Sequence, residues 1–412
     1  MPNKSKQRKY VSAKLDLFFQ NLFQAWKNYH GKECKYLITV SMLPEASIDA
    51  IESLDDGTSL FYAMYLLRIM TKLKNDGQDI FDTLPNGKKR YFKDLLTHKD
   101  FLSKYESKMD YFDSAYYFVE KCLKNKVPEK TKVMDIFGRA MINSLALMNE
   151  SGQPIGTGLY LGVSAIDHSC APNAVWILHE NEMIVRAIEN VDSFENIRIT
   201  YLSKLFESTY ERQKTLSENY FFDCDCPKCQ DQNTDQFKSS LICSKCQNCV
   251  PYSTKKCYQC KTEKDPKDLE KFMNLKTKLT PLIDTSNNDE IEFSQFEQLY
   301  TIADKVFHPF DEYYIVLLNI LWDNYWAEKN IEKCLEIIPK LMMNYYHNYP
   351  KYFPIIGFKE ITYAYLCKAS NSLEEARSHI GKAEEILQVS LGEDHPRMEA
   401  LRTFKKSLGT MP

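Results

Sequence analysis

The spacing of apolar positions changes twice along the chain. In the N-terminal part, apolar residues recur at helical intervals, first over residues 15–29 and then over most of 46–130. Between Ala174 and Tyr201 the pattern is that of β-strands, with short runs of β-branched and aromatic residues. After Pro266 the helical pattern returns and continues to the end of the chain. The sequence therefore predicts an α+β protein whose strands lie in the middle.

The central segment contains the predicted strands. A helix is expected from Val133 to Met148, followed by a turn that contains Gly156 and Gly158. The runs AVWILH and EMIVRAI, separated by Glu180-Asn181, predict a β-hairpin. IRITY, residues 197–201, predicts a further strand.

The C-terminal pattern predicts helices separated by short turns, after a polar linker at 284–290. The expected helices are Phe293–Phe307, Glu312–Glu328, Ile331–His347, Phe353–Cys367, Leu373–Leu391 and Pro396–Leu408. Helix pairs of this length stack into tetratricopeptide-like arrays, and Ala364, Ala376 and Ala383 would allow close helix contact. Pro339 is expected to kink its helix. Such an array either binds a peptide partner or only supports the domains beside it.

The cysteine spacing predicts metal sites. Eight of the 13 cysteines fall in closely spaced groups between Cys224 and Cys260, and in a reducing compartment this spacing favours metal over disulfides. Cys224, Cys226 and Cys229 form an incomplete tetrahedral zinc site, and Cys170 is the natural fourth ligand.

A second group combines Cys243, Cys246 and Cys249 with the pair Cys257 and Cys260. Paired CxxC motifs are a strong signal for a structural zinc site, here Cys243, Cys246, Cys257 and Cys260. Cys249 is either a spare thiol or an alternate ligand. We therefore expect two Zn²⁺ ions per chain, with a stabilising role for the second.

Composition narrows the function classes. The 53 basic and 56 acidic residues nearly balance, so no overall field favours nucleic acid or an acidic membrane surface. No apolar run is long enough to span a bilayer, and no secretory signal is evident, so a cytoplasmic or nuclear location is expected. The basic first ten residues could be a nuclear address, although a solvated terminus is the simpler interpretation.

Four motifs occur together in the middle of the chain: Gly158-Leu159-Tyr160, Asp167-His168-Ser169-Cys170-x-Pro172-Asn173, Ile199-Thr200-Tyr201 and Cys224-x-Cys226-x2-Cys229. In this order and spacing they resemble the SET and MYND-domain (SMYD) family of protein-lysine methyltransferases. The resemblance extends weakly over the C-terminal helices, including Leu391-Gly392-Glu393-Asp394-His395-Pro396.

This resemblance implies transfer of a methyl group from S-adenosylmethionine to a lysine amine of a protein or peptide. Tyr201 matches the catalytic tyrosine of the family. The cofactor-binding positions are Asp167, His168, Tyr201 and Phe222, and the substrate-channel positions are Leu145, Tyr201 and Tyr220. Cys170, Cys224, Cys226 and Cys229 match the ligands of the zinc site that follows the SET domain.

The chain departs from the family pattern at several positions. Asp167 stands where the family has asparagine, and a carboxylate cannot donate to the carboxylate of the cofactor but can accept from its amine. Phe194-Glu195-Asn196 replaces Gly-Glu-Glu, and Leu145 replaces an aromatic residue.

The N-terminal SET strands and their glycine-rich loop have no match ahead of Trp26. Trp26, His30 and Cys34 resemble the tail of a MYND zinc finger, so the chain is expected to be a fragment or to have lost part of its cofactor cradle. From spacing alone, His30 and Cys34 are a surface histidine and a half-buried thiol rather than a metal site, because two ligands do not make one.

The expected organisation is a residual MYND-like tail and helix (1–45), a helical insert (46–130), the C-terminal half of a SET core (131–203), the post-SET zinc site with a zinc ribbon (204–262), and a tetratricopeptide-like helical domain (263–412). The leading hypothesis is a protein-lysine N-methyltransferase, impaired or not. The alternative is a non-catalytic, zinc-stabilised interaction scaffold that retains a degenerate SET core.

Overall fold

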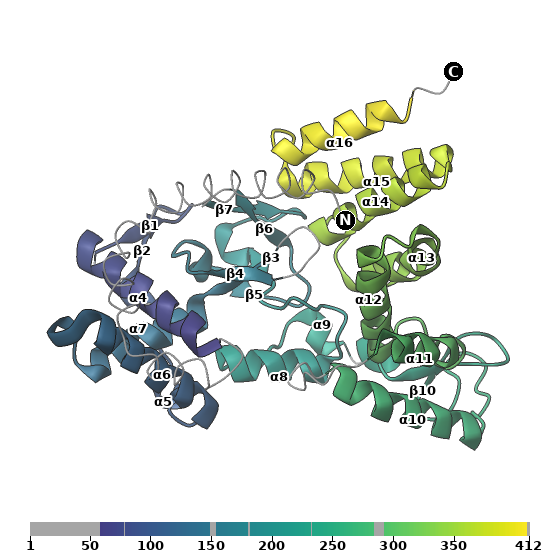
Figure 1. The fold of residues 1–412 in the computed structure, drawn as a ribbon, viewed down its shortest axis with the longest axis horizontal. Helices are drawn as coiled ribbons and strands as arrows, with labels where there is room; N and C mark the ends of the chain where they lie inside the picture. Colours follow the sequence, from purple (N-terminus) through teal and green to yellow (C-terminus); the bar gives the residue numbers. More distant parts are fainter. Residues whose placement is uncertain are drawn as a thin grey trace, which may run out of the picture. The chain divides into compact units, whose positions relative to one another are not determined.

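The computed structural model describes residues 58–77, 79–148, 154–179, 182–231, 233–283 and 292–409 (Figure 1). The chain forms two compact units. Of the described residues, one unit contains those up to Ser144 together with Leu159–Ala165, and the other contains those within 145–158 and from Ile166 onward. The predicted helix at 15–29, the pair His30 and Cys34, and the linker at 284–290 lie outside the described residues. Within the described residues, no helix has both the length and the apolar character needed to cross a membrane.

The first unit is helical. Its helices are α4 (Thr58–Asp76), α5 (Lys99–Leu102), α6 (Glu106–Leu123) and α7 (Lys130–Asn143). Between α4 and α5 the chain forms an antiparallel hairpin of β1 (Phe81–Thr83) and β2 (Lys89–Tyr91). Side chains from α4, α6 and α7 form its core, including Leu66, Phe112, Phe118 and Phe137. The helical pattern predicted for this stretch is therefore confirmed for its described part, apart from the hairpin.

The helix expected to run to Met148 ends earlier, at Asn143. Ser144 has an extended backbone, and its hydroxyl donates to the carbonyl of Ala140 in the last turn. The next residues form β3 (Leu145–Met148), which pairs antiparallel with β4 (Pro154–Gly158). The prediction was wrong here because pairing between strands outweighs the helical spacing of a short apolar run.

The strands of the second unit are short. β6 (Ala174–His179) pairs antiparallel with β7 (Glu182–Ala187), which confirms the predicted hairpin. β5 (Asp167–His168) pairs parallel with β8 (Arg198–Ile199). β8 stops short of Tyr201 because the backbone N–H of Tyr201 donates to the ring of His168 instead of to a strand.

The rest of the second unit begins with α8 (Thr209–Tyr220), α9 (Pro227–Gln230) and the hairpin β9 (Ser240–Ile242) with β10 (Cys249–Pro251). The helices α10 (Pro266–Ile283), α11 (Phe293–Val306), α12 (Glu312–Ala327), α13 (Ile331–Asn348), α14 (Pro354–Ala369), α15 (Leu373–Leu391) and α16 (Pro396–Ser407) follow. The predicted C-terminal helices are confirmed, and each end lies within two residues of the expected position. The α+β class is likewise confirmed.

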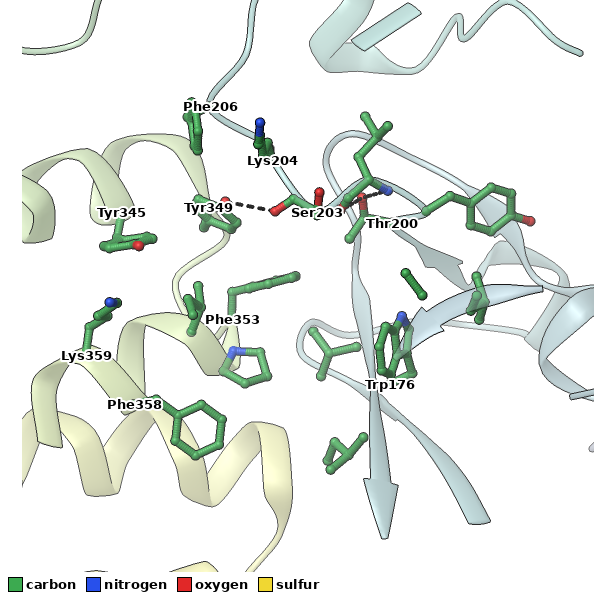
Figure 2. Close-up of a pocket in the computed structure, with 18 of the residues that line it drawn as sticks. Trp176, Thr200, Ser203, Lys204, Phe206, Tyr345, Tyr349, Phe353, Phe358 and Lys359 are labelled. Atoms are coloured by element: carbon green, nitrogen blue, oxygen red, sulfur yellow. Dashed lines mark hydrogen bonds between the residues drawn. The ribbon is translucent and has the colours of Figure 1, made fainter. Parts of the chain in front are cut away.

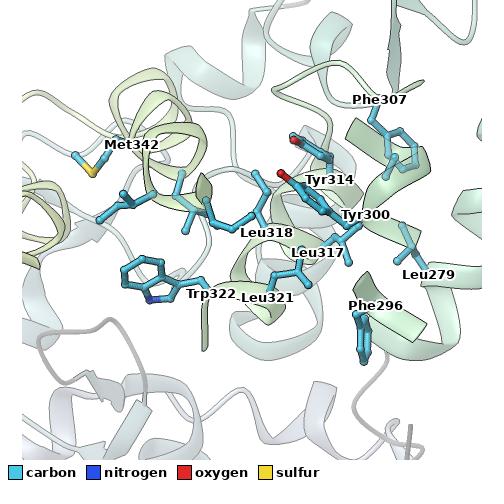
Figure 3. Close-up of a cluster of buried hydrophobic side chains, with 14 of the residues drawn as sticks. Leu279, Phe296, Tyr300, Phe307, Tyr314, Leu317, Leu318, Leu321, Trp322 and Met342 are labelled. Carbon is cyan, nitrogen blue, oxygen red and sulfur yellow. The ribbon is translucent and has the colours of Figure 1, made fainter. Parts of the chain in front are cut away.

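Helix α12 lies at the centre of the core of the C-terminal helices (Figure 3). Leu317, Leu318 and Leu321 are fully buried, and they pack with aromatic residues from α11 and the segment after it. Asp311 caps α12 by accepting from the backbone N–H groups of Tyr313 and Tyr314. The start of α12 is therefore fixed by a buried carboxylate, which satisfies backbone donors that would otherwise be unpaired.

Small residues allow α14 and α15 to approach closely. Ala364, Ala376 and Ala383 are fully buried, as their spacing predicted. Gly357 marks a contact that sequence inspection missed, because a Cβ atom there would lie 2.5 Å from Cγ of Leu387. Gly381, on α15, has no neighbouring atom within 4 Å of the same position.

We expect Gly357→Ala to lower the free energy of unfolding by about 1–3 kcal/mol, because the added methyl group forces α14 and α15 apart. The matched control, Gly381→Ala, should raise it by up to about 1 kcal/mol through helix propensity alone. Denaturant unfolding of both variants checks this expectation. Equal effects of the two substitutions would show that the close helix contact is not a packing constraint.

Candidate functional site

Four cysteines from separate parts of the second unit converge on one point. Cys170 follows β5, Cys224 and Cys226 lie between α8 and α9, and Cys229 lies in α9. Their sulfur atoms are all within 4.8 Å of one another, and those of Cys170 and Cys229 are 3.6 Å apart. Four thiols at this separation could hold a tetrahedral metal ion of the kind that zinc forms.

Two cationic side chains surround this cluster. Arg212 is fully buried, and its guanidinium donates to the carbonyl of Glu207, to Oγ1 of Thr209 and, at 3.6 Å, to the sulfur of Cys229. Lys228 donates to the carbonyls of Leu205 and Asn348, at 2.9 and 3.0 Å.

A buried guanidinium whose partners are a carbonyl, a hydroxyl and a sulfur needs a compensating negative charge nearby. Four thiolates around one Zn²⁺ carry a net charge of about −2, and this charge would lie beside Arg212 and Lys228. The donor set and its surroundings therefore fit a metal-bound cluster better than four neutral thiols.

His168 connects the cysteine cluster to Tyr201. Its Nδ1 accepts from the backbone N–H of Tyr201 at 2.9 Å, so the proton of a neutral ring lies on Nε2. Nε2 is 3.3 Å from the sulfur of Cys170, to which it can donate. Burial lowers the pKa of His168 to about 4, which keeps the ring neutral near pH 7. The histidine thus has a supporting position beside a thiol ligand.

Tyr201, Tyr220 and Phe222 form an aromatic cluster against His168. The ring of Tyr201 lies 5.0 Å from that of Tyr220, 5.2 Å from His168 and 6.5 Å, edge to face, from Phe222. Phe221, which lies between Tyr220 and Phe222 in the sequence, has a left-handed backbone with a φ of 61° and ends α8. The hydroxyl of Tyr201 donates to the carbonyl of Ile166 at 2.6 Å.

Asp167 lies apart from this cluster. Its side chain is 80% exposed, and a carboxylate oxygen is 4.0 Å from the guanidinium of Arg198 on the paired strand. Phe194–Asn196, which replaces the glycine-containing turn of the resemblance, forms a 3₁₀ helix. The amide of Asn173 holds it by donating to the carbonyl of Asn196 and accepting from the N–H of Arg198.

The second cysteine group has the geometry of two knuckles. The sulfur atoms of Cys243, Cys246, Cys257 and Cys260 lie within 4.8 Å of one another. The knuckle residues Gln247 and Lys261 have φ values of 60° and 58°, which turn the backbone back toward the cysteines. Cys249 is buried in β10 outside this set, and burial raises the pKa of its thiol to about 11. The structure therefore places Cys249 as a packed thiol rather than as a member of the group.

A cavity of about 690 Å³ lies between the short strands and the C-terminal helices of the second unit (Figure 2). Leu145 and Tyr201 line it, as do side chains from β6, the segment after β8, and helices α12 to α14. The lining residues that sequence inspection missed include Trp176, Lys204, Phe206, Tyr349, Phe353 and Lys359. No motif marks these positions, because the cavity joins segments more than 100 residues apart in the chain.

Lys359 is the most deeply buried charged side chain that lines this cavity. The residue is 6% exposed, and its ammonium lies 4.8 Å from the ring centroid of Trp322 and 5.9 Å from that of Tyr345. Burial lowers the pKa of Lys359 to about 8, and Asp323, which also lines the cavity, opposes this shift. The structure records no hydrogen-bond acceptor for this ammonium among the described residues.

A scan against protein-family models found no match. The chain is 27% identical over 290 residues to histone-lysine N-methyltransferase ASHR1 of Arabidopsis thaliana, covering 66% of this chain and 59% of that protein. It is 33% identical over 111 residues to human histone-lysine N-methyltransferase SMYD3, which covers 27% of this chain and 26% of that protein. Human N-lysine methyltransferase SMYD2 is 20% identical over 331 residues, which covers 77% of this chain and 70% of SMYD2.

The fold and the site define an α+β protein with two four-cysteine clusters, an aromatic cluster beside one of them, and a helical C-terminal region. The similarity to ASHR1 covers 66% of the chain, and the similarity to SMYD2 covers 77% of it. Over most of its length the chain is similar to proteins that are named as SMYD or histone-lysine methyltransferases, and it spans 59% of ASHR1 and 26% of SMYD3.

Replacing Lys359 by methionine should change stability in a pH-dependent way. Because the pKa of Lys359 is about 8 in the folded chain and 10.5 ordinarily, the folded state binds fewer protons between these values. Its burial therefore costs stability below pH 8, and this cost disappears as the pH rises toward 10.5. Asp323 and Tyr345 face the ammonium from α12 and α13, and burial keeps Tyr345 neutral by raising its pKa.

We expect Lys359→Met to raise the midpoint of thermal unfolding at pH 7 and to raise it less at pH 10. Lys382→Met, at an exposed position on α15, is the control and should shift neither midpoint. A Lys359→Met gain that is independent of pH, or a loss at pH 7, would contradict the burial cost.

Proposed function

We propose that this chain is an S-adenosylmethionine-dependent protein-lysine N-methyltransferase. The observation that carries the proposal is the position of Tyr201, which lies in the aromatic cluster beside His168 and also lines the cavity of about 690 Å³. A tyrosine that belongs to the aromatic cluster and also lines the cavity can contact a cofactor on one side and a peptide on the other. The names of the relatives supply the reaction class.

Tyr201 orients the target amine in this proposal. Its hydroxyl donates to the carbonyl of Ile166, and in this proposal its oxygen would accept a hydrogen bond from the lysine nitrogen. Lysine in water has a pKa near 10.4, and surroundings of aromatic side chains such as Tyr220 favour the neutral, nucleophilic form. No general base is needed, because desolvation lowers the pKa of the amine. The cofactor supplies the methyl group as a sulfonium.

His168, Phe222 and the edge of the β5 and β8 pair would hold the cofactor. Phe222 and His168 lie with their ring centroids 6.0 Å apart, which provides an apolar wall beside a neutral imidazole. Asp167 would accept from the amine of the cofactor, and Arg198, whose guanidinium is 4.0 Å from the Asp167 carboxylate, would supply the donors that a carboxylate lacks. A cation next to Asp167 therefore offsets the repulsion that the aspartate alone would impose on a carboxylate.

The proposal includes one Zn²⁺ ion in each cysteine cluster. The first ion would tie the turn after β5 to the segment between α8 and α9, and so fix His168 and Tyr201 relative to Phe222. The second would hold the two knuckles closed. We also propose a nuclear or cytoplasmic location, in keeping with relatives that are named for histone and lysine substrates.

Metal analysis of the purified chain should find two zinc ions per chain. Cys226→Ser should remove one ion and also lower binding of S-adenosylmethionine, because the cluster supports His168. Cys249→Ser is the matched control, and its zinc content should stay at two because Cys249 lies outside the second group. A zinc content of one or none in the unmodified chain would overturn this assignment.

Tyr201→Phe should reduce methyl transfer by about 100-fold, because the phenyl ring keeps the packing but loses the oxygen that orients the amine. Binding of S-adenosylmethionine, followed by calorimetry, should change by less than about threefold. Tyr365→Phe, on the exposed surface of α14, should leave both unchanged. If the unmodified chain bound no cofactor at millimolar concentration, the non-catalytic scaffold would be the correct description.

A further inference from the structure

We propose that the cavity beside Tyr201 contains a carboxylate-binding subsite, in which the ammonium of Lys359 binds an acidic side chain of the bound peptide. This inference deepens the proposed function and rests on it, because the lysine to be methylated lies in the same peptide. It adds a preference among peptides that the motifs around Tyr201 do not specify.

The ammonium of Lys359 has no hydrogen-bond acceptor among the described residues, although the carboxylate of Asp323 acts on its charge. The aromatic faces of Trp322 and Tyr345 stabilise the cation in part, but they provide no acceptor for its three N–H donors. Lys238 is also buried, yet its ammonium donates to the side-chain oxygen of Asn348. Lys228 likewise donates to two backbone carbonyls. Lys359 therefore differs from these two lysines in lacking an acceptor among the described residues.

The cavity is the route by which an acceptor can reach Lys359. Lys359 lines the cavity, and Figure 2 shows it on the helical side, beside Tyr345 and close to Phe358. Helices α12 and α13 cover it with Trp322 and Tyr345. An acceptor therefore reaches the ammonium through the cavity, which has the volume of an ordinary ligand site.

A side-chain carboxylate fits the chemistry of this end of the cavity. Tyr345, Phe353 and Phe358 give this end of the cavity aromatic walls, which suit the methylene groups of a glutamate or aspartate side chain. Asp323 lines the same cavity and repels anions in proportion to their charge, so it disfavours a phosphate more than a single carboxylate. A single carboxylate paired with a buried ammonium gains a charge-assisted hydrogen bond.

Tyr201 and Lys359 come from different elements but face one cavity. In Figure 2 the segment that includes Thr200 lies on the strand side and Lys359 on the helical side. A peptide whose lysine reaches Tyr201 and whose chain continues through the cavity therefore passes Lys359. An acidic residue at a fixed distance from the target lysine would meet the ammonium there.

The test uses dye-labelled peptides with one central lysine in a neutral polar background. A single glutamate is moved through the flanking positions, and each peptide has a partner with glutamine in its place. Binding to the full chain is followed by fluorescence anisotropy at pH 7. At one position or two adjacent ones, we expect the glutamate peptide to bind about tenfold more tightly than its glutamine partner.

Lys359→Met should bring the two affinities to within about twofold of each other, while Lys382→Met should preserve the difference. The comparison of peptides on the unmodified chain needs no variant, so a folding defect cannot decide the outcome. Equal binding of glutamate and glutamine peptides to the unmodified chain would overturn the inference. So would a preference for glutamate that survives in Lys359→Met.

Methylation of the same peptides separates the two proposals. If the unmodified chain methylates the glutamine peptides and shows no preference for glutamate, the subsite is wrong and the proposed function stands. If the chain neither binds nor methylates any peptide of the series, both proposals fail.

Discussion

The convergence of Cys170 with Cys224, Cys226 and Cys229 is the constraint on which the rest of the site depends. Cys170 is separated from the others by more than 50 residues, yet the four sulfurs lie within 4.8 Å of one another. The buried core around them is small, so hydrophobic burial alone gives limited stabilisation to this region. A metal-bound cluster would further stabilise the fold of this region and would also provide the negative charge that buried Arg212 requires.

Single polar contacts connect this cluster to His168, and His168 to Tyr201. Nε2 of His168 lies against Cys170, its Nδ1 accepts from the backbone of Tyr201, and the hydroxyl of Tyr201 donates to Ile166. Each step fixes one polar atom of the next residue, so the ring of Tyr201 has a defined position although β8 ends before it. The aromatic cluster is thus oriented by polar contacts more than by strand pairing.

Features that depend on residues close together in the sequence could be predicted, whereas features that depend on contacts between distant residues could not. The C-terminal helices could be placed within two residues, because helical periodicity and caps such as Asp311 are local signals. The end of α7 was misplaced because β3 forms only through its pairing with β4, which the apolar run itself does not encode. Arg212, Lys228 and Lys359 were missed because the importance of a buried cation depends on its surroundings, and no local pattern marks them.

The cavity shows why the helical array matters to the chemistry of the site. One wall comes from β6 and the segment after β8, which contains Tyr201, and the other comes from helices whose positions depend on the core around Leu317 and Leu321. The close contact of α14 and α15 at Gly357 sets the position of the helix that carries Lys359, two residues further on. Packing between two helices thus determines where a buried charge faces the cavity. In the proposed subsite, a residue far from the motifs would therefore help to select the bound peptide.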